Sequence, residues 1–213
     1  QPRSRGLGDV YKRQVLGGGV AGTNSIAVAV GMGAEVTVLD TNLNRLRELD
    51  ALYAGRLRTI ASNSFEIERA VKDADLVIGS VLIPGAKAPK LVTNALVKKM
   101  KPGAVLVDIA IDQGGCFEDS KPTTHAEPTF KVHDTVFYCV ANMPGAVPHT
   151  STYALTNATL PYVKAIATLG WKKALQADPA LALGLNTFAG AVVNEPVAIA
   201  HQMESKPLAS ALA

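Results

Sequence analysis

Residues 15–40, VLGGGVAGTNSIAVAVGMGAEVTVLD, decide the expected fold. A short apolar run leads into a glycine turn, a helix rich in alanine and valine follows, and a second apolar strand ends on Asp40. A strand, a helix and a strand in this order form a βαβ unit that binds dinucleotides. Gly17 permits the tight turn, Gly19 lets a pyrophosphate approach the backbone, and Gly22 lets the helix pack close to the strand. The N–H groups at the helix start then favour the pyrophosphate.

Asp40 indicates which dinucleotide binds. An acid about 20 residues after the glycine turn accepts hydrogen bonds from the ribose hydroxyls of NAD and repels the 2′-phosphate of NADP. Arg45 can soften that repulsion, so NAD is the expected cofactor and NADP stays an alternative. The other interpretation of residues 15–40 is a glycine-rich loop that binds no ligand. The helix, the second strand and the terminal acid follow the glycine turn at the expected spacing, and this disfavours that interpretation.

The composition excludes several classes of protein. The chain has 213 residues, 48% of them hydrophobic, and a net charge of +3, which is too small to indicate a nucleic-acid partner. Two cysteines form no disulfide framework, and the four histidines have no metal-ligand spacing, so no metal is expected. No apolar run reaches the length of a membrane span and no signal-peptide pattern opens the chain. We therefore expect a cytoplasmic protein without a membrane partner.

The remaining sequence predicts the architecture. Short apolar strands alternate with amphipathic helices from residue 15 to residue 140, and we expect an α/β fold with a Rossmann-type doubly wound parallel sheet. Expected strands cover residues 35–40, 56–62, 75–81, 104–109 and 135–140. Expected helices cover residues 23–32, 42–51, 64–72 and 90–100. From residue 148 the sequence is helical, with helices expected at residues 150–168, 171–176, 179–183 and 190–202 and no further strand.

The domain prediction has three parts. Residues 1–14 are polar and basic, and Lys12, Arg13 and Gln14 occupy the place where a first strand buried on both faces should be apolar. We expect residues 1–14 to be a non-native or disordered start and residues 15–147 to form the NAD-binding domain. Residues 148–213 are expected to be a helical segment of a second, mostly missing domain.

Two acids follow the strand expected at residues 104–109. Asp108 at the strand end is expected to be structural, whereas Asp112 precedes the loose backbone of Gln113, Gly114 and Gly115. A carboxylate beside a nicotinamide can orient a substrate amine or water, or move protons. A turn or helix-capping acid is the other interpretation of Asp112, and the spacing alone leaves both open.

Several motifs resemble one enzyme family. The segments VLDTNLNRLRELD, GAKAPKLV, DIAIDQGGC and VANMP closely resemble the C-terminal half of bacterial alanine dehydrogenase, over residues 15–213. The resemblance implies an oxidoreductase that converts L-alanine, NAD and water to pyruvate, ammonium and NADH. It also implies a hexamer in the full-length parent.

The resemblance also implies site residues. It assigns Asp112 the role of the catalytic aspartate, and it places Lys121 where the family often has an arginine that contacts the cofactor. The cofactor-binding residues that it implies are Gly17, Gly19, Val20, Ala21, Gly22, Asp40, Arg45, Ser62, Val81, Leu82, Ile109, Ala110, Ile111, Asp112, Lys121, Val140, Ala141, Asn142 and Met143.

The chain departs from the family in one respect. The catalytic histidine and the lysine and arginine that hold the substrate carboxylate belong to an N-terminal half that this sequence lacks. We therefore expect the chain alone to bind NAD without turning over alanine. Two alternatives stay open. One is the NAD(P)-binding subunit of proton-translocating transhydrogenase, which usually has a glutamate at the position of Asp112. The other is a non-catalytic NAD-binding module.

Overall fold

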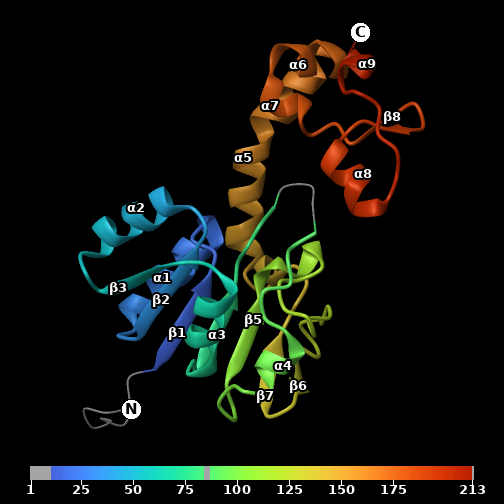
Figure 1. The fold of residues 1–213 in the computed structure, drawn as a ribbon. Helices are drawn as coiled ribbons and strands as arrows, with labels where there is room; N and C mark the ends of the chain where they lie inside the picture. The colour runs from blue at the N-terminus through green and yellow to red at the C-terminus, as the bar shows by residue number, and fades with distance from the viewer. Residues whose placement is uncertain (1–10, 84–86, 213) are drawn as a thin grey trace. The chain divides into compact units, whose positions relative to one another are not determined.

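The structure, a computed structural model, describes residues 11–83 and 87–212 (Figure 1). The described chain forms two compact units. The first holds the residues up to Leu82 and Ala88–Met143, and the second holds the residues from Pro144 onward, together with Ile83 and Lys87. The domain boundary expected after residue 147 lies slightly downstream of this division.

The first unit is built on a seven-stranded sheet of order β3-β2-β1-β4-β5-β7-β6. Neighbouring strands are parallel except β6, which pairs antiparallel with β7. The strands are β1 (Lys12–Leu16), β2 (Glu35–Asp40), β3 (Leu57–Ala61), β4 (Leu76–Gly79), β5 (Val105–Asp108), β6 (Thr129–Val132) and β7 (Thr135–Tyr138). This is the predicted doubly wound α/β sheet, and the strand order reverses between β1 and β4. Ligands bind at such a reversal, outside the carboxyl ends of the strands.

Helices cover both faces of this sheet. They are α1 (Val20–Gly31), α2 (Leu43–Tyr53), α3 (Ser64–Lys72) and α4 (Asn94–Val97). Successive side chains of a strand point to opposite faces, so Val15 and Leu16 of β1 enter different cores. Val15 packs in the core that holds Ile26 of α1 and Leu49 of α2. Leu16 packs in the core that holds Val71 of α3 and α4 residues.

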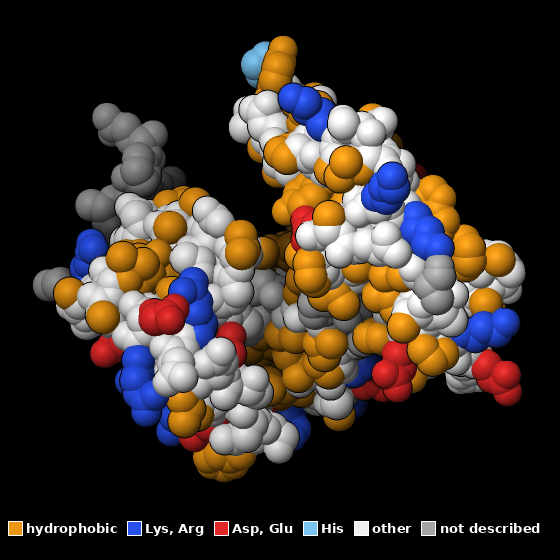
Figure 2. Space-filling view, turned by 90° about the horizontal axis from the view of Figure 1, so that it is seen from above, with side chains coloured by type: hydrophobic (Ala, Val, Ile, Leu, Met, Phe, Trp, Pro, Cys, Tyr) orange, Lys and Arg blue, Asp and Glu red, His pale blue; other side chains and the backbone are white. Residues whose placement is uncertain are grey.

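The second unit is mostly helical. Its elements are α5 (Pro148–Leu169), α6 (Trp171–Ala177), α7 (Pro179–Ala182), β8 (Thr187–Phe188), β9 (Ala191–Val192), α8 (Glu195–His201) and α9 (Ala209–Leu212). None of the 22 residues of α5 is buried within the described chain. Leu155, Tyr162, Ile166 and Leu169 of α5 are exposed and follow one another at spacings of seven, four and three residues, which places them on one face. The space-filling view shows exposed hydrophobic side chains, in orange, between the polar ones on the surface of the molecule (Figure 2).

A search of the described helices for a membrane span finds none that is both long and apolar enough. This finding concerns residues 11–83 and 87–212 only.

The structure corrects the predicted secondary structure in several places. The helix expected over residues 90–100 is reduced to α4, because Thr93 caps it and Leu91 donates from its backbone N–H to the Cys116 carbonyl over 2.7 Å. The edge strand β6 was not predicted. The expectation of no strand after residue 148 was wrong, because β8 and β9 form a hairpin whose turn holds Ala189 and Gly190 at positive φ. The helix expected over residues 190–202 begins only at Glu195, after this hairpin.

A structural start at residue 15 is also incorrect. Lys12, Arg13 and Gln14 lie in β1, and Gln14 pairs in register with Thr37 of β2 and Val77 of β4. The backbone hydrogen bonds that join these strands do not depend on the side chains. A polar sequence can therefore form the first part of β1. Residues 1–10 lie outside the described residues, and the foreign origin of residues 1–14 stays a prediction.

The effect of this polar sequence on the free energy of unfolding can be measured at Gln14. Its side chain is only 6% exposed, and its Oε1 has no hydrogen-bond partner among the described residues. Because a buried amide oxygen without a hydrogen-bond partner is costly, Gln14→Val is expected to raise the free energy of unfolding by about 1–2 kcal/mol. Urea denaturation followed by circular dichroism measures the difference. Gln14→Glu, which buries a charge, should lower stability, and a Gln14→Val variant no more stable than the parent would contradict the account.

Candidate functional site

The glycine turn between β1 and α1 is held by very close packing. Gly17 has φ +99°, and a Cβ there would lie 3.0 Å from the Ser80 carbonyl oxygen. A Cβ on Gly22 would overlap the Gly17 carbonyl oxygen. The Ser80 hydroxyl, just past β4, donates toward the carbonyls of Leu16 (3.0 Å) and Gly17 (2.8 Å). The turn is therefore fixed to the strands on either side of the sheet reversal.

Open space lies beside Gly19, at the start of α1. Gly19 is the N-cap residue with φ −66°, and a Cβ added there would meet no described atom within 4 Å. The first turn of this 12-residue helix carries no acidic side chain. Backbone N–H groups and the positive end of the helix dipole thus face space that a side chain could fill. A pyrophosphate fits this arrangement.

Asp40 and Arg45 fix the middle of the turn from the other side. Asp40 accepts hydrogen bonds from the backbone N–H of Gly18 (2.6 Å) and of Asn42 (2.8 Å). Arg45 donates from Nε to the Gly18 carbonyl (2.8 Å) and from Nη2 to the Thr23 hydroxyl (2.7 Å). Because these protein groups use the Arg45 donors, the guanidinium is engaged in the turn itself. That arrangement favours the ribose diol of NAD over the 2′-phosphate of NADP.

A fully buried carboxylate organises the loop after β5. Asp108 is 0% exposed and accepts from the backbone N–H groups of Ala110 (3.1 Å), Cys116 (2.9 Å) and Phe117 (3.3 Å). The Ser120 hydroxyl donates to it as well, over 2.5 Å. A buried charge is tolerated only with such partners. Asp108 therefore acts as a structural acid.

Asp112, by contrast, is exposed. It lies on the 3-10 helix η1 (Ile109–Gln113), which follows β5 directly. The N–H bonds to Asp108 hold both ends of this loop, so η1 stays at the carboxyl edge of the sheet. An exposed carboxylate at this edge can reach a ligand bound there.

A second loop follows β7 at the same edge. Asn142 has φ +56°, and its carbonyl oxygen lies 3.1 Å from Nε2 of His125. Thr123 pairs with the loop through its backbone, donating to the Cys139 carbonyl (3.0 Å) and accepting from Ala141 (3.1 Å). Val140 is buried, so the loop is fixed where it leaves the strand.

Most of the predicted cofactor-binding residues lie at the carboxyl edge of the sheet. They lie in the ends of the strands β1, β2, β3, β4, β5 and β7 or in the segments that follow them, and these six strands are parallel, so their carboxyl ends share one edge. These residues are the glycines at 17, 19 and 22, Val20, Ala21, Asp40, Ser62, Val81, Ile109, Ala110, Ile111, Asp112, Val140, Ala141, Asn142 and Met143. Ser62 donates from its backbone N–H to the Asp40 carbonyl over 2.9 Å.

Two further predicted cofactor-binding residues are described separately. Leu82 is 66% exposed. The Lys121 ammonium lies 4.5 Å from the centre of the Phe130 ring.

Sequence reasoning missed Gly18, Thr23 and Ser80. Their roles depend on contacts between segments far apart in the chain, such as the bonds from Ser80 back to the end of β1. A GxGxxG pattern gives no signal for such partners.

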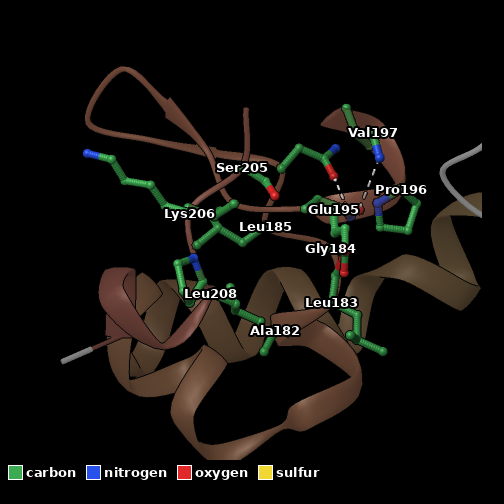
Figure 3. Close-up of a pocket in the computed structure, with 14 residues that line it drawn as sticks. Ala182, Leu183, Gly184, Leu185, Glu195, Pro196, Val197, Ser205, Lys206 and Leu208 are labelled. Carbon is green, nitrogen blue, oxygen red and sulfur yellow. Dashed lines mark hydrogen bonds between the residues drawn. The ribbon is translucent and has the colours of Figure 1, made fainter. Parts of the chain in front are cut away.

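The second unit contains a pocket of about 830 Å³ between α7, α8 and the segment that follows α8 (Figure 3). The Asn194 amide donates to the Leu183 carbonyl (3.3 Å) and to Asn186 Oδ1 (3.0 Å), and its oxygen accepts from the Val197 N–H. These bonds join the loops of the pocket to one another. The donors and the acceptor of the Asn194 side chain are therefore engaged within the protein.

The fold and the glycine turn together define a dinucleotide-binding domain of the Rossmann type. The family model described as "Alanine dehydrogenase/PNT, C-terminal domain" matches residues 7–195. The chain belongs to this family. The family and the fold indicate NAD as the cofactor.

Known relatives agree with this family. Alanine dehydrogenase of Mycolicibacterium smegmatis is 67% identical over 184 residues, which cover 86% of this chain and 50% of the relative. Alanine dehydrogenase of Staphylococcus saprophyticus is 58% identical over 199 residues, covering 93% of this chain and 54% of the relative. The chain thus spans about half the length of the curated relatives that it matches.

Two solved structures are similar as well. An L-alanine dehydrogenase superposes with a TM-score of 0.79 at 50% identity, over 90% of this chain and 53% of that one. A transhydrogenase from Sinorhizobium meliloti has a TM-score of 0.58 at 31% identity, over 64% of this chain and 39% of that one. The similarity to alanine dehydrogenase is the greater of the two in TM-score, sequence identity and coverage.

Two glycine substitutions separate folding from binding. Gly22→Ala is expected to lower the free energy of unfolding by about 3 kcal/mol, because the new methyl overlaps the Gly17 carbonyl. Gly19→Ala should leave stability unchanged but weaken NAD binding by roughly tenfold, because the methyl fills the space beside the helix start. Thermal unfolding and calorimetric titration with NAD measure the two effects. Gly31→Ala in the same helix is the control, and a Gly19→Ala variant with full NAD affinity would contradict the assignment.

The buried thiols predict a pH dependence. Burial raises the pKa of the Cys116 thiol, and the nearby Asp108 carboxylate raises it further; burial also raises the pKa of the Cys139 thiol. Above about pH 9 the thiols of the unfolded chain ionise while the folded Cys116 thiol stays protonated, so stability falls as pH rises. Cys116 contributes a slope that approaches about 1.4 kcal/mol per pH unit once the unfolded thiol is ionised, and the raised pKa of Cys139 adds to the fall in the same direction. The Cys116→Ala, Cys139→Ala double variant should lose this extra slope between pH 9 and 10.5 in urea denaturation. Equal slopes in both proteins would contradict the prediction.

Proposed function

We propose that this chain is the NAD-binding half of an alanine dehydrogenase, which converts L-alanine, NAD and water to pyruvate, ammonium and NADH. The observation that carries the proposal is the position of two features at one sheet edge. The glycine turn with Asp40 forms the adenosine side of a dinucleotide site, and the loop with Asp112 follows β5 at the same edge. Relatives named alanine dehydrogenase share 56–67% of the residues over the matched length.

The residues of the chain then have distinct tasks. NAD, when bound, supplies the hydride acceptor for the oxidation of the amine-bearing carbon. The α1 N-terminus binds the pyrophosphate, and Asp40 binds the ribose diol. The loops at residues 109–112 and 140–143 enclose the nicotinamide end. Asp112 orients the attacking water and accepts or returns a proton, while positioning supplies much of the rate.

The partners are part of the same proposal. L-alanine and pyruvate are the small-molecule substrates, and an upstream half supplies the histidine, lysine and arginine of the substrate site. The apolar face of α5 supports a homo-oligomer, a hexamer in the full-length parent, because exposed apolar stripes of this kind mark interfaces. We place the enzyme in the cytoplasm, in alanine catabolism, without a nucleic-acid or membrane partner.

The second candidate function is that of the NAD(P)-binding subunit of transhydrogenase. The similar structure from Sinorhizobium meliloti favours it, at lower identity and coverage than alanine dehydrogenase. The aspartate at position 112 speaks against it, since that family usually has a glutamate there. A non-catalytic NAD-binding module is the third candidate, and it predicts binding without any turnover.

A chimera tests these candidates against one another. The upstream half of the Mycolicibacterium smegmatis alanine dehydrogenase, joined to this chain from residue 15, is expected to form NADH from L-alanine, since the matched halves are 67% identical. In the chimera, Asp112→Asn should lower kcat at least ~100-fold with little change in the Kd for NADH, because proton transfer typically contributes that much. Stopped-flow NADH absorbance measures turnover, and fluorescence titration measures binding.

The contrary outcomes are distinct. Hydride transfer from NADH to a thio-NADP analogue without alanine turnover would support the transhydrogenase function instead. A chimera that binds NADH but does neither reaction would support the non-catalytic module. Asp119→Asn, another acid of the same segment, is the matched control and should leave turnover unchanged.

A further inference from the structure

Three backbone carbonyls converge on the ammonium group of Lys90. Its Nζ donates to the carbonyl oxygens of Gly114 (2.6 Å), Gly115 (2.9 Å) and Phe117 (3.0 Å). A lysine ammonium has three N–H donors, and this set uses all of them. Lys90 is far from these residues in sequence, so the contact joins two separate segments.

The turn at Gly114 and Gly115 needs this arrangement of charges. Both glycines have positive φ, +87° and +75°, and a Cβ on Gly115 would lie 2.7 Å from the Asp108 carboxylate. On one side, N–H groups of the loop point to the Asp108 carboxylate; on the other, carbonyls point to the Lys90 ammonium. Peptide dipoles between an anion and a cation are stabilised by both charges. Without the cation, three carbonyl oxygens would face one another.

Backbone pairing keeps the segment of Lys90 beside the loop. Ala88 donates to the Gln113 carbonyl (3.0 Å), Leu91 donates to Cys116 (2.7 Å), and Glu118 donates to Val92 (2.9 Å). Because this pairing is independent of the Lys90 side chain, replacing the ammonium should leave the segments together. The ammonium then affects mainly the geometry of the glycine turn.

Asp112 comes two residues before that turn. The C-cap of η1 is Gly114, whose backbone N–H donates to the carbonyls of Ala110 and Ile111. A change in the orientation of the Gly114 peptide therefore changes the end of η1 that carries Asp112. The effect reaches the nicotinamide side of the proposed site and leaves the adenosine side at Asp40 untouched.

We propose that Lys90 is a positioning residue for the Asp112 loop: its positive charge, by holding the carbonyls of Gly114, Gly115 and Phe117, sets the nicotinamide side of the NAD site. This inference rests on the proposed function and names a residue that acts through the loop without contacting the reacting atoms. It predicts that loss of the charge selectively weakens ligands that carry a nicotinamide.

The test compares NADH with ADP-ribose, which lacks the nicotinamide, on the full 213-residue chain. Lys90→Met is expected to weaken NADH binding at least ~10-fold and ADP-ribose binding less than ~2-fold. Lys98→Met, a change at another exposed lysine, is the matched control and should alter neither. Equal weakening of both ligands, or no weakening of either, would overturn the inference.

A chemical rescue distinguishes charge from packing. Lys90→Cys treated with 2-bromoethylamine carries an ammonium again, and the native thiols Cys116 and Cys139 are buried and therefore protected. The modified variant should regain NADH affinity to within ~3-fold of the parent. Failure of this rescue, with the modification verified by mass spectrometry, would overturn the inference.

Amide NMR spectra give a readout that needs no ligand. The resonances of residues 112–117 should shift in Lys90→Met and return after aminoethylation of Lys90→Cys. Unmoved resonances would overturn the inference. Failure of the NAD site on which the inference rests looks different, because the unmodified chain would then bind neither NADH nor ADP-ribose. Failure of the alanine dehydrogenase function alone would show as absent turnover in the chimera and would leave these binding measurements unchanged. If Lys90→Met does not fold, Lys90→Gln takes its place in every measurement.

Discussion

The first unit depends on the close approach of Gly22 in α1 to Gly17 at the end of β1. No side chain fits between them, and the Ser80 hydroxyl ties the same turn to β4. This contact places the N-terminus of a 12-residue helix at the carboxyl edge of the sheet, where the strand order reverses. The proposed pyrophosphate site beside Gly19 follows from that placement, since the helix brings its free N–H groups with it. Asp40 and Arg45 then hold the peptide group of Gly18 between them.

In our proposal, the opposite side of the site depends on a pair of charges. Asp108, buried at the end of β5, binds backbone N–H groups, and Lys90 binds backbone carbonyls of the same loop. Neither charge needs to touch a substrate to matter, because together they fix the loop that carries the exposed Asp112. The two sides differ in kind. The proposed adenosine side combines steric contacts between glycines with the hydrogen bonds of Asp40 and Arg45 to Gly18, whereas the proposed nicotinamide side depends on the hydrogen bonds of Asp108 and Lys90.

The sequence predicted the local elements well and the long-range contacts poorly. The βαβ unit was predictable because glycine spacing, helix period and the terminal acid all lie within residues 15–40. The helix expected over residues 90–100 was not formed in full, because pairing with the segment after Asp108 outweighs the helical period there. The polar start of β1 was misjudged for a related reason: backbone pairing tolerates Gln14 in a buried strand. Asp108 was expected to be a structural acid, but the backbone groups that it binds could not be predicted. Lys90 could not be given a role, since the carbonyls that it binds come near only in the folded chain.

The central claim is that NAD binds along the carboxyl edge of the first unit, from the glycine turn to the loop of Asp112. A crystal structure of the chain grown with NAD tests it most directly. The account predicts the pyrophosphate at the start of α1 beside Gly19, the adenosine ribose at Asp40, and the nicotinamide between the loops at residues 109–112 and 140–143. NAD bound in the pocket of the second unit, or turned so that its nicotinamide lies at Asp40, would contradict it.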